Sequence, residues 1–183
     1  MTGLLGGAFD PPHAGHVALA RGAVRHFGLE RLIVLVVAAP GHRQVHLDAE
    51  MRLELARAAF PGYEVELDEH PRTVDMLRER RFVDPLFIVG ADELAGFLAW
   101  KDPDGVLELA RLGVAARPGY PRARLDAVLA RLARPERVEL FELEPVPVSS
   151  SEVRGRVARG EPIDGLVPPA VAEAIADLGL YRR

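Results

Sequence analysis

Two histidines, His13 and His16, stand three positions apart and follow closely on the adjacent glycines Gly6 and Gly7. Residues three apart on a helix share one face, so both imidazoles can reach the same ligand. Glycine has no Cβ and can take a positive φ, which lets backbone N–H groups approach an anion. The start of a following helix adds unpaired N–H groups and a positive dipole end. The pattern predicts a phosphate-binding turn, in which Gly15 keeps the surface low enough for a ligand to reach both rings.

Two other interpretations of these histidines stay open. They can be ordinary surface or helix-start residues, although that leaves the glycines unexplained. Together with His42 and His46, which are four positions apart, they can also be zinc ligands. Against zinc, the chain has no cysteine, and no Glu lies between the histidines as it does in a metalloprotease helix. We favour phosphate binding.

A second group of chemically capable residues lies toward the C-terminal end, at Ser149, Ser151, Glu152 and Arg154. The spacing of Ser149 and Glu152 is that of a capping box, which starts a helix. Arg154 then lies near the free N–H groups of that helix, and a guanidinium grips phosphate oxygens with two parallel donors. The segment therefore predicts a clamp for pyrophosphate.

Apolar runs typical of strands alternate with helical patterns along the chain. The run from Arg31 to Ala38 has no polar interruption after its first residue, as in a strand buried on both faces of a parallel sheet. Asp48 and Thr73 are placed to cap helices. We expect strands at 2–5, 31–38, 63–67, 86–89, 112–116 and 138–143, and helices at 17–27, 48–60, 73–80, from about 92, 105–110, 121–132, 150–159 and 168–178.

This alternation predicts an α/β protein with a doubly wound, Rossmann-like parallel sheet. We expect one domain over residues 1–183, with the C-terminal helices from about 149 carrying the clamp. Ligands of such sheets bind beyond the carboxyl ends of the strands, at the point where the strand order reverses. That places three segments together: the glycine turn, the loop after Ala38, and Gly90-Ala91-Asp92, whose aspartate also fits a helix N-cap.

Composition limits the classes of partner. With 183 residues, 49% of them hydrophobic, the chain has ordinary globular composition. The net charge of −4 argues against a nucleic-acid binder, and the absence of cysteine excludes disulfides and thiolate metal sites. The longest apolar run, Leu32 to Ala39, is too short to span a bilayer, and no signal-peptide pattern begins the chain. We expect a cytoplasmic protein with no membrane partner, and a homo-oligomer stays possible.

Residues 6–16, Gly-Gly-Ala-Phe-Asp-Pro-Pro-His-Ala-Gly-His, resemble the signature of the nucleotidylyltransferase superfamily. In its nicotinate mononucleotide adenylyltransferases the signature reads Gly-Gly-Thr/Ser-Phe-Asp-Pro-x-His-x-Gly-His. Later segments resemble the same branch over nearly the whole chain, at 97–100 (Phe-x-x-Trp), 117–120 (Arg-Pro-Gly-Tyr), 149–154 (Ser-x-Thr-x-x-Arg, with Ser151 for threonine) and 178–182.

Three positions depart from this family pattern. Gly41 replaces the second proline of Pro-Pro-His-Lys/Arg, Arg72 replaces the tyrosine of Ser-Tyr-Thr, and Lys101 stands where tyrosine is common. The first departure precedes His42 and Arg43, which would face phosphate, whereas the other two concern the pyridine side of the substrate.

The resemblance implies adenylyl transfer from ATP to nicotinate mononucleotide, giving nicotinate adenine dinucleotide and pyrophosphate in NAD synthesis. Mg²⁺ is expected to arrive with ATP, held by phosphates and water, so no protein metal ligands are assigned. Alternatives in the same class are nicotinamide mononucleotide and phosphopantetheine adenylyltransferases. From other classes, a non-catalytic nucleotide-binding module and a zinc-binding module remain.

The resemblance also assigns roles residue by residue. Trp100 is expected to stack on the pyridine ring, with a place in the core as the alternative. The sequence clearly assigns no charged residue to the nicotinate carboxylate, so we expect backbone N–H groups near Thr73 and in the loop at 100–101 to hold it, with Arg72 or Lys101 adding attraction from the rim. Catalytic roles fall to His13, His16 and Arg154. ATP binding falls to Gly6, Gly7, Phe9, His13, Gly15, His16, Gly90, Asp92, Ser149, Ser151 and Arg154. Binding of the second substrate falls to Ala8, Asp10, His42, Arg43, Thr73, Trp100 and Lys101.

Overall fold

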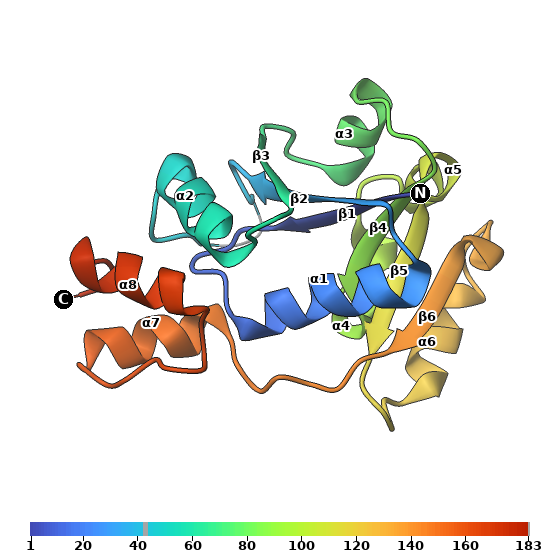
Figure 1. Cartoon of the computed structure of the whole chain (residues 1–183). Coiled ribbons are helices and arrows are strands. Elements are labelled where there is room, and N and C mark those ends of the chain that lie inside the picture. The colour runs from blue at the N-terminus through green and yellow to red at the C-terminus, as the bar shows by residue number, and fades with distance from the viewer. Residues whose placement is uncertain (42–43, 183) are drawn as a thin grey trace.

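A parallel six-stranded sheet with the order β3-β2-β1-β4-β5-β6 forms the centre of the protein (Figure 1). The computed structural model describes residues 1–41 and 44–182. The strand order reverses between β1 and β4, which confirms the expected doubly wound α/β class. The strands are β1 (Thr2–Gly7), β2 (Arg31–Val37), β3 (Glu64–Asp68), β4 (Pro85–Gly90), β5 (Arg111–Ala116) and β6 (Val138–Glu142).

Every expected helix is present, with ends that differ from the expectation by a few residues. The helices are α1 (Ala14–Phe27), α2 (Ala49–Ala59), α3 (Thr73–Glu79), α4 (Ala91–Ala95), α5 (Pro103–Leu109), α6 (Arg122–Leu129), α7 (Ser150–Ala158) and α8 (Pro169–Asp177), with short 3₁₀ turns at Phe97–Ala99 and Pro135–Arg137.

Two cores lie on the two faces of the sheet, because successive residues of a strand point in opposite directions. Leu5 and Val34 pack in the core shared with α1, α2, α7 and α8. Their neighbours Leu4 and Ile33 pack in the core shared with α3, α4, α5 and α6. All four side chains are at most 2% exposed. Burying such a side chain contributes about 1.5–3 kcal/mol, so the uninterrupted apolar strands are what hold both helical layers to the sheet.

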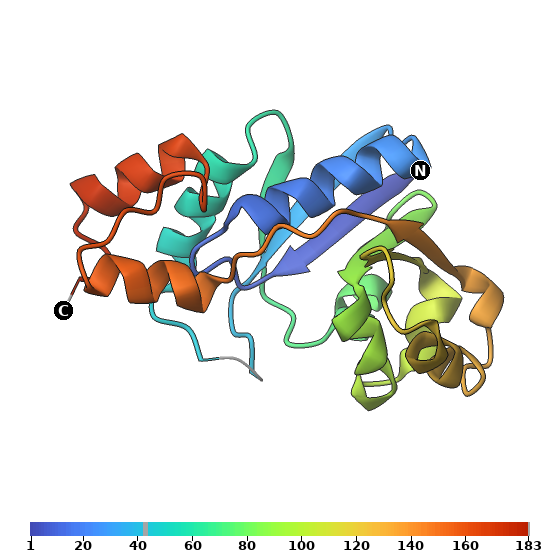
Figure 2. The same cartoon turned by 90° about the horizontal axis from the view of Figure 1, so that it is seen from below.

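The last two helices lie at the carboxyl ends of β1 and β2, next to α2 (Figures 1 and 2). Val153 of α7 and Val171 of α8 are fully buried in the first core. Just before α8, the Leu166 carbonyl accepts a hydrogen bond of 2.8 Å from the Ala14 N–H at the start of α1. The C-terminal segment is thereby fixed against the glycine turn that follows β1.

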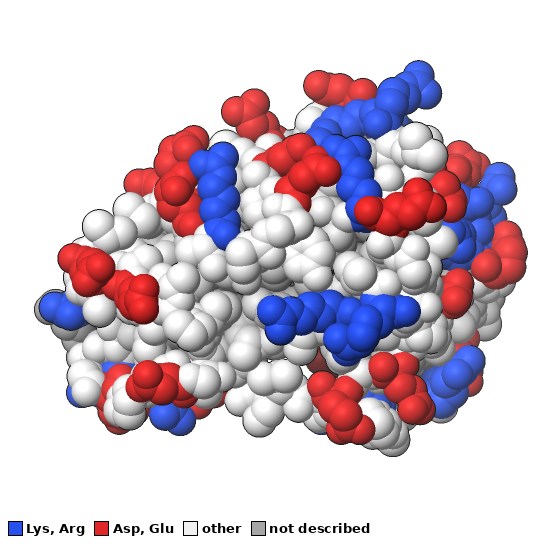
Figure 3. Space-filling view, viewed as in Figure 1, with Lys and Arg blue, Asp and Glu red and all other residues white. Residues whose placement is uncertain are grey.

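Acidic and basic side chains are intermingled over the face drawn in Figure 3, as the small net charge suggests. Within the described part of the chain, no helix combines the length and the apolar character needed to cross a membrane.

Candidate functional site

A pocket of about 480 Å³ opens where β1 and β4 end, at the reversal of strand order. Its wall is built by segments that follow β1, β2, β3 and β4, so distant parts of the chain contribute to one cavity. Eight of the residues expected in the site line it: Gly6, Gly7, Ala8, His16, Thr73, Gly90, Trp100 and Lys101.

Gly6 and Gly7 serve the site differently from the expectation. Neither has a positive φ, because both end β1 in an extended conformation, and the residue with positive φ is Phe9, at 50°. What the two positions require is the missing Cβ. A Cβ on Gly7 would lie 2.8 Å from the Phe9 ring, and one on Gly6 would lie 3.1 Å from the Phe87 ring. The glycines therefore let two aromatic rings close in beneath the pocket.

His13 and His16 come together at the start of α1, as the spacing predicts. Their rings stack with centroids 3.7 Å apart, and the backbone N–H of His13 donates to Nδ1 of His16 at 3.2 Å. A nitrogen that accepts a hydrogen bond carries no proton, so neutral His16 holds its proton on Nε2. Phe9, 2% exposed, packs its edge against the His16 ring with centroids 5.0 Å apart and holds that orientation.

His13 is a neutral imidazole at physiological pH, because burial lowers its pKa from 6.5 to about 4. Among the described residues, its Nδ1 is a buried side-chain nitrogen without a hydrogen-bond partner. The space above Gly15 is filled by this ring, since a Cβ there would lie 3.1 Å from His13 Nδ1. Gly15 therefore lets the His13 ring lie close to the helix, and its expected second role, keeping the surface low enough for a ligand to reach both rings, stays a prediction.

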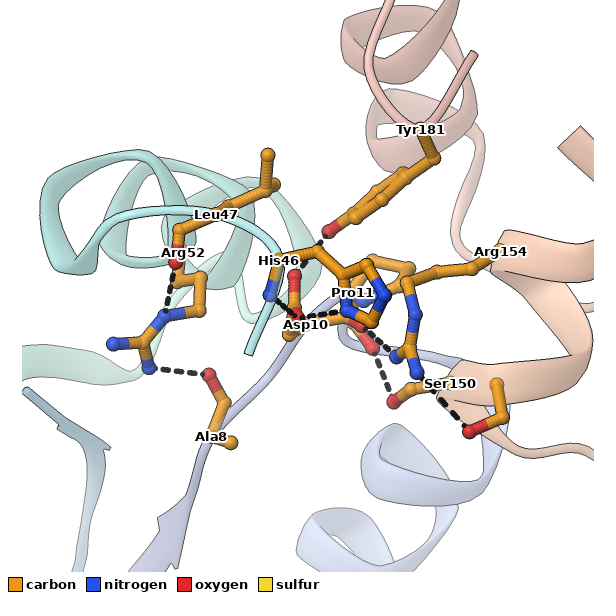
Figure 4. A network of polar contacts seen from close by, with 10 residues as sticks. Ala8, Asp10, Pro11, His46, Leu47, Arg52, Ser150, Arg154 and Tyr181 are labelled. Carbon is orange, nitrogen blue, oxygen red and sulfur yellow. Dashed lines mark hydrogen bonds and ion pairs between the residues drawn. The ribbon is translucent and has the colours of Figure 1, made fainter. Parts of the chain in front are cut away.

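The predicted clamp is joined to the first turn through α7 (Figure 4). Arg154 donates from Nη1 to the Asp10 carbonyl at 2.6 Å and from Nη2 to Ser151 Oγ at 3.1 Å. Ser149 caps α7 by accepting the Glu152 N–H at 3.1 Å, as the capping box predicts. The Glu152 carboxylate is bound to Arg156 instead of completing the box. These two bonds use two of the five N–H donors of Arg154, so the guanidinium has further donors for phosphate oxygens.

Asp10 is a junction between the glycine turn and two distant segments (Figure 4). Its carboxylate is 3% exposed and accepts from the Tyr181 hydroxyl at 2.8 Å and from the His46 N–H at 2.6 Å. Burial and the Asp10 carboxylate raise the pKa of Tyr181, so its hydroxyl keeps the proton that it donates. The Ser150 hydroxyl donates to the Pro11 carbonyl beside it at 2.8 Å. These contacts direct the Asp10 carboxylate into the protein, away from the expected contact with substrate.

Arg52 is a residue of the site region that sequence reasoning missed. Its side chain is 1% exposed and donates to the carbonyls of Ala8, Val37, Ala38 and Leu47 at 2.7 to 3.1 Å. One buried guanidinium thus ties together the segments after β1 and β2 and the approach to α2. The sequence did contain an indication that Arg52 is buried. It shares a helix face with Leu55, Ala56 and Ala59, so it lies on the apolar side of α2.

The wall formed by α3 and by the segment after α4 carries Arg72, Thr73, Trp100 and Lys101. The expected cap at Thr73 is wrong, because Arg72 is the N-cap residue of α3 and has an extended backbone. Its carbonyl accepts hydrogen bonds from the backbone N–H groups of Asp75 and Met76. Trp100 is half-buried and packs edge-on against Phe97 and Phe87, at 5.1 and 6.0 Å, so it belongs to both the core and the pocket wall.

Gly90 begins the next turn, and the expected start at Asp92 is one residue late, since α4 begins at Ala91. Asp92 lies in the first turn, where its carboxylate accepts the Tyr120 hydroxyl at 3.1 Å. Six of the expected residues, besides the buried Phe9 and Asp10, lie outside the pocket lining: His13, Gly15, Asp92, Ser149, Ser151 and Arg154.

The predicted residues His42 and Arg43 lie outside the described residues. The zinc interpretation included His42, and among the residues that the structure describes, no three His, Asp or Glu side chains form a group that could hold a metal ion.

Comparisons with known proteins bear on the family and on the fold. Residues 4–156 match the family model described as cytidylyltransferase-like. A nicotinate-nucleotide adenylyltransferase of Rubrobacter xylanophilus is 38% identical over 99% of this chain and 92% of its own length. Another, of Thermus thermophilus, is 38% identical over 98% of each chain. The structure of Plasmodium falciparum nicotinic acid mononucleotide adenylyltransferase complexed with NaAD covers 98% of this chain and 96% of its own, with a TM-score of 0.77 at 15% identity, and so shares the fold.

Proposed function

The chain belongs to the cytidylyltransferase-like family and, within it, to the nicotinate-nucleotide adenylyltransferases; on this basis we propose how its site transfers the adenylyl group of ATP to nicotinate mononucleotide. The products are nicotinate adenine dinucleotide and pyrophosphate. The observation that carries the proposal is one pocket lined by the glycine turn and His16 on one side and by Trp100 on another.

In the reaction, a 5′-phosphate oxygen of the mononucleotide attacks the α-phosphorus of ATP. The new P–O bond forms as the bond from the α-phosphorus to the oxygen bridging to the β-phosphate breaks, and pyrophosphate leaves with that oxygen. No protein nucleophile is required. The site must align two anions and stabilise charge on the α-phosphoryl oxygens, for which alignment contributes up to about 7–11 kcal/mol and one preorganised donor about 3–4 kcal/mol.

His16 is the donor to the α-phosphate in this proposal. Its Nδ1 accepts from the His13 N–H at 3.2 Å, which puts the Nε2 proton on the opposite edge of the ring. Neutral His13 supports neighbouring phosphate oxygens, and the end of β1 at Gly6 and Gly7 admits the phosphates closely. The ring orientation is set before substrate arrives, which is what makes a donor effective in the transition state.

Ser149, Ser151 and Arg154 form the grip on the leaving pyrophosphate. The side chain of Arg154 is positioned by the Asp10 carbonyl and by Ser151 Oγ, both within 3.1 Å. Since Tyr181 holds the same Asp10 at 2.8 Å, the C-terminal tail helps to place the clamp against the glycine turn. Gly90 and Asp92 are assigned to the nucleotide ribose. Asp92 is already oriented by Tyr120.

The second substrate lies against Thr73 and Trp100 in this proposal, with the indole stacked on the pyridine ring. Ala8 borders its phosphate, and Asp10 acts through the residues that it positions. A divalent metal is proposed to accompany ATP, because it neutralises phosphate charge. The described side chains offer no three-ligand group for Mg²⁺, so the ion is proposed to come with ATP on phosphate oxygens and water, neutralising part of their charge.

Release of pyrophosphate from ATP tests the proposal with three acceptors in parallel: nicotinate mononucleotide, nicotinamide mononucleotide and phosphopantetheine. We expect the nicotinate compound to give the highest kcat/KM. A higher kcat/KM with the amide or with phosphopantetheine would contradict the proposed substrate. No pyrophosphate release with any of the three acceptors would contradict the proposed activity.

A further inference from the structure

We propose that Arg72 is the residue that distinguishes the acid mononucleotide from its amide, by binding the carboxylate on the pyridine ring. The inference rests on the proposed function and deepens it. Acid and amide differ by one negative charge, so discrimination requires a cation whose charge is available in the pocket. Two long-chain cations lie among the described lining residues, Arg72 and Lys101, and their surroundings differ.

The charge of Lys101 is already matched. Its Nζ lies 2.8 and 2.9 Å from the two carboxylate oxygens of Asp75 on α3. The hydrogen bond from Lys101 lowers the pKa of the Asp75 carboxyl, which therefore stays ionised across the physiological range. A substrate carboxylate would have to compete with Asp75 for this ammonium group.

The charge of Arg72 is not matched in this way. Its Nη1 donates to the neutral carbonyl of Pro71 at 2.9 Å, and within residues 1–41 and 44–182 no carboxylate forms an ion pair with its guanidinium. In the same wall, the His70 ring lies between two carboxylates, with Nδ1 2.7 Å from Asp68 Oδ1 and Nε2 3.0 Å from Glu79 Oε2. Arg72 is thus the lining cation with donors left for an incoming anion.

Gly41 is a neighbour of the Arg72 side chain in the pocket wall. A Cβ on Gly41 would lie 3.7 Å from Arg72 Nη1, and both residues line the pocket. The guanidinium therefore reaches from the start of α3 across to the segment after β2. These are two of the positions where the sequence departs from its family pattern, and the structure places them in contact range.

A guanidinium suits this task because its planar fork can donate two parallel hydrogen bonds to one carboxylate. Because the Arg72 side chain is exposed, water and salt partly screen its attraction for the substrate carboxylate. A single charge pair about 4 Å apart in water changes affinity by about fivefold, and partial exclusion of water increases that factor. We therefore expect about a five- to twentyfold contribution to the acid preference, decreasing at high salt.

The test measures kcat/KM for both mononucleotides at saturating ATP in the wild type and in Arg72→Met, Arg72→Lys, Lys101→Met and Arg81→Met. Arg81→Met is the matched control, because it removes the same charge from an exposed residue outside the pocket lining. Binding of both mononucleotides is followed separately through the fluorescence of Trp100, the only tryptophan, with a non-hydrolysable ATP analogue present.

Arg72→Met should lower the ratio of acid to amide kcat/KM by about fivefold or more, through KM, with the amide value changed less than about twofold. Arg72→Lys should keep part of the preference, and Arg81→Met all of it. An unchanged ratio in Arg72→Met, equal losses for both substrates, or a larger fall in Lys101→Met would overturn the assignment. These outcomes concern the variants alone, whereas a wild type that fails to use the acid would contradict the proposed function itself.

Discussion

The backbone N–H of His13 donates to Nδ1 of His16 at 3.2 Å, and this one bond fixes which edge of the second imidazole can act on substrate. The donor must be Nε2, so His16→Gln, whose terminal amide can reach a similar position, should keep more activity than His16→Asn. His16→Ala should lower kcat by about a hundredfold or more, as expected for losing a donor to developing charge.

Single-turnover and steady-state rates of the three His16 variants decide this prediction, with circular dichroism to show that each is folded. Near-normal turnover in folded His16→Ala would exclude His16 from the chemistry. Greater activity in the asparagine variant than in the glutamine variant would contradict the tautomer.

Arg154 should act mainly on ATP. Arg154→Ala should raise the ATP KM or lower kcat by about tenfold or more, because a charge-assisted contact to the leaving group is lost. Arg154→Lys should restore activity only in part, since a point charge cannot replace two directed donors. Arg156→Ala, which removes the same charge from the same helix, is the control, because Arg156 is paired with Glu152. If the lysine variant matched the wild type, Arg154 would supply only general positive charge.

Trp100 has two measurable roles. Trp100→Ala should raise the KM for nicotinate mononucleotide by about tenfold, the loss expected for an aromatic stack of about 1–2 kcal/mol, and leave the ATP KM nearly unchanged. Because the indole also packs on Phe87 and Phe97, the variant should lose about 2 kcal/mol of unfolding free energy, measured in urea. An acceptor KM equal to that of the wild type would leave Trp100 with the core role alone.

Burial of His13 makes folding stability depend on pH in a defined window. Its pKa is about 4 in the folded protein and 6.5 in an unfolded chain, so between these values the unfolded state binds the proton. Stability from neutral His13 is fully present above pH 6.5 and is lost as the pH falls toward 4. At about 1.4 kcal/mol for each tenfold change in proton affinity, the loss amounts to at most about 3 kcal/mol.

Urea unfolding of the wild type and His13→Gln from pH 7.5 to 4 isolates this contribution, because the other titrating groups are common to both proteins. The unfolding free energy of the wild type relative to the variant should fall with pH. A difference that stays constant, or rises toward acid pH, would contradict a neutral buried His13.

Local patterns in the sequence were sufficient where the determinant is local. The uninterrupted apolar run of β2 predicted a strand buried on both faces of a parallel sheet, and Asp48 caps α2 as expected by accepting the Met51 N–H at 2.8 Å. The start of α7 at Ser149 followed from the same kind of rule. In each case the deciding interaction joins residues only a few positions apart.

The missed features depend on contacts between distant segments. Tyr181 and Asp10 are 171 positions apart, and Arg52 meets the Ala8 carbonyl across 44. Neither pairing leaves a periodic signal. Gly6 and Gly7 were expected for their backbone freedom, yet their role depends on Phe9 and Phe87 rings that only the folded chain brings near. The difference between Arg72 and Lys101 also depends on a distant contact. Asp75 pairs with Lys101 and thereby leaves Arg72 as the cation that can bind a substrate carboxylate.

The most direct measurement of the central claim is isolation of the product. The wild-type protein is incubated with ATP, Mg²⁺ and an equimolar mixture of nicotinate and nicotinamide mononucleotides, and the dinucleotides are separated and identified by mass spectrometry. The account predicts nicotinate adenine dinucleotide as the main product, formed in equal amount with pyrophosphate. Nicotinamide adenine dinucleotide in equal or larger amount, or no dinucleotide at all, would contradict it.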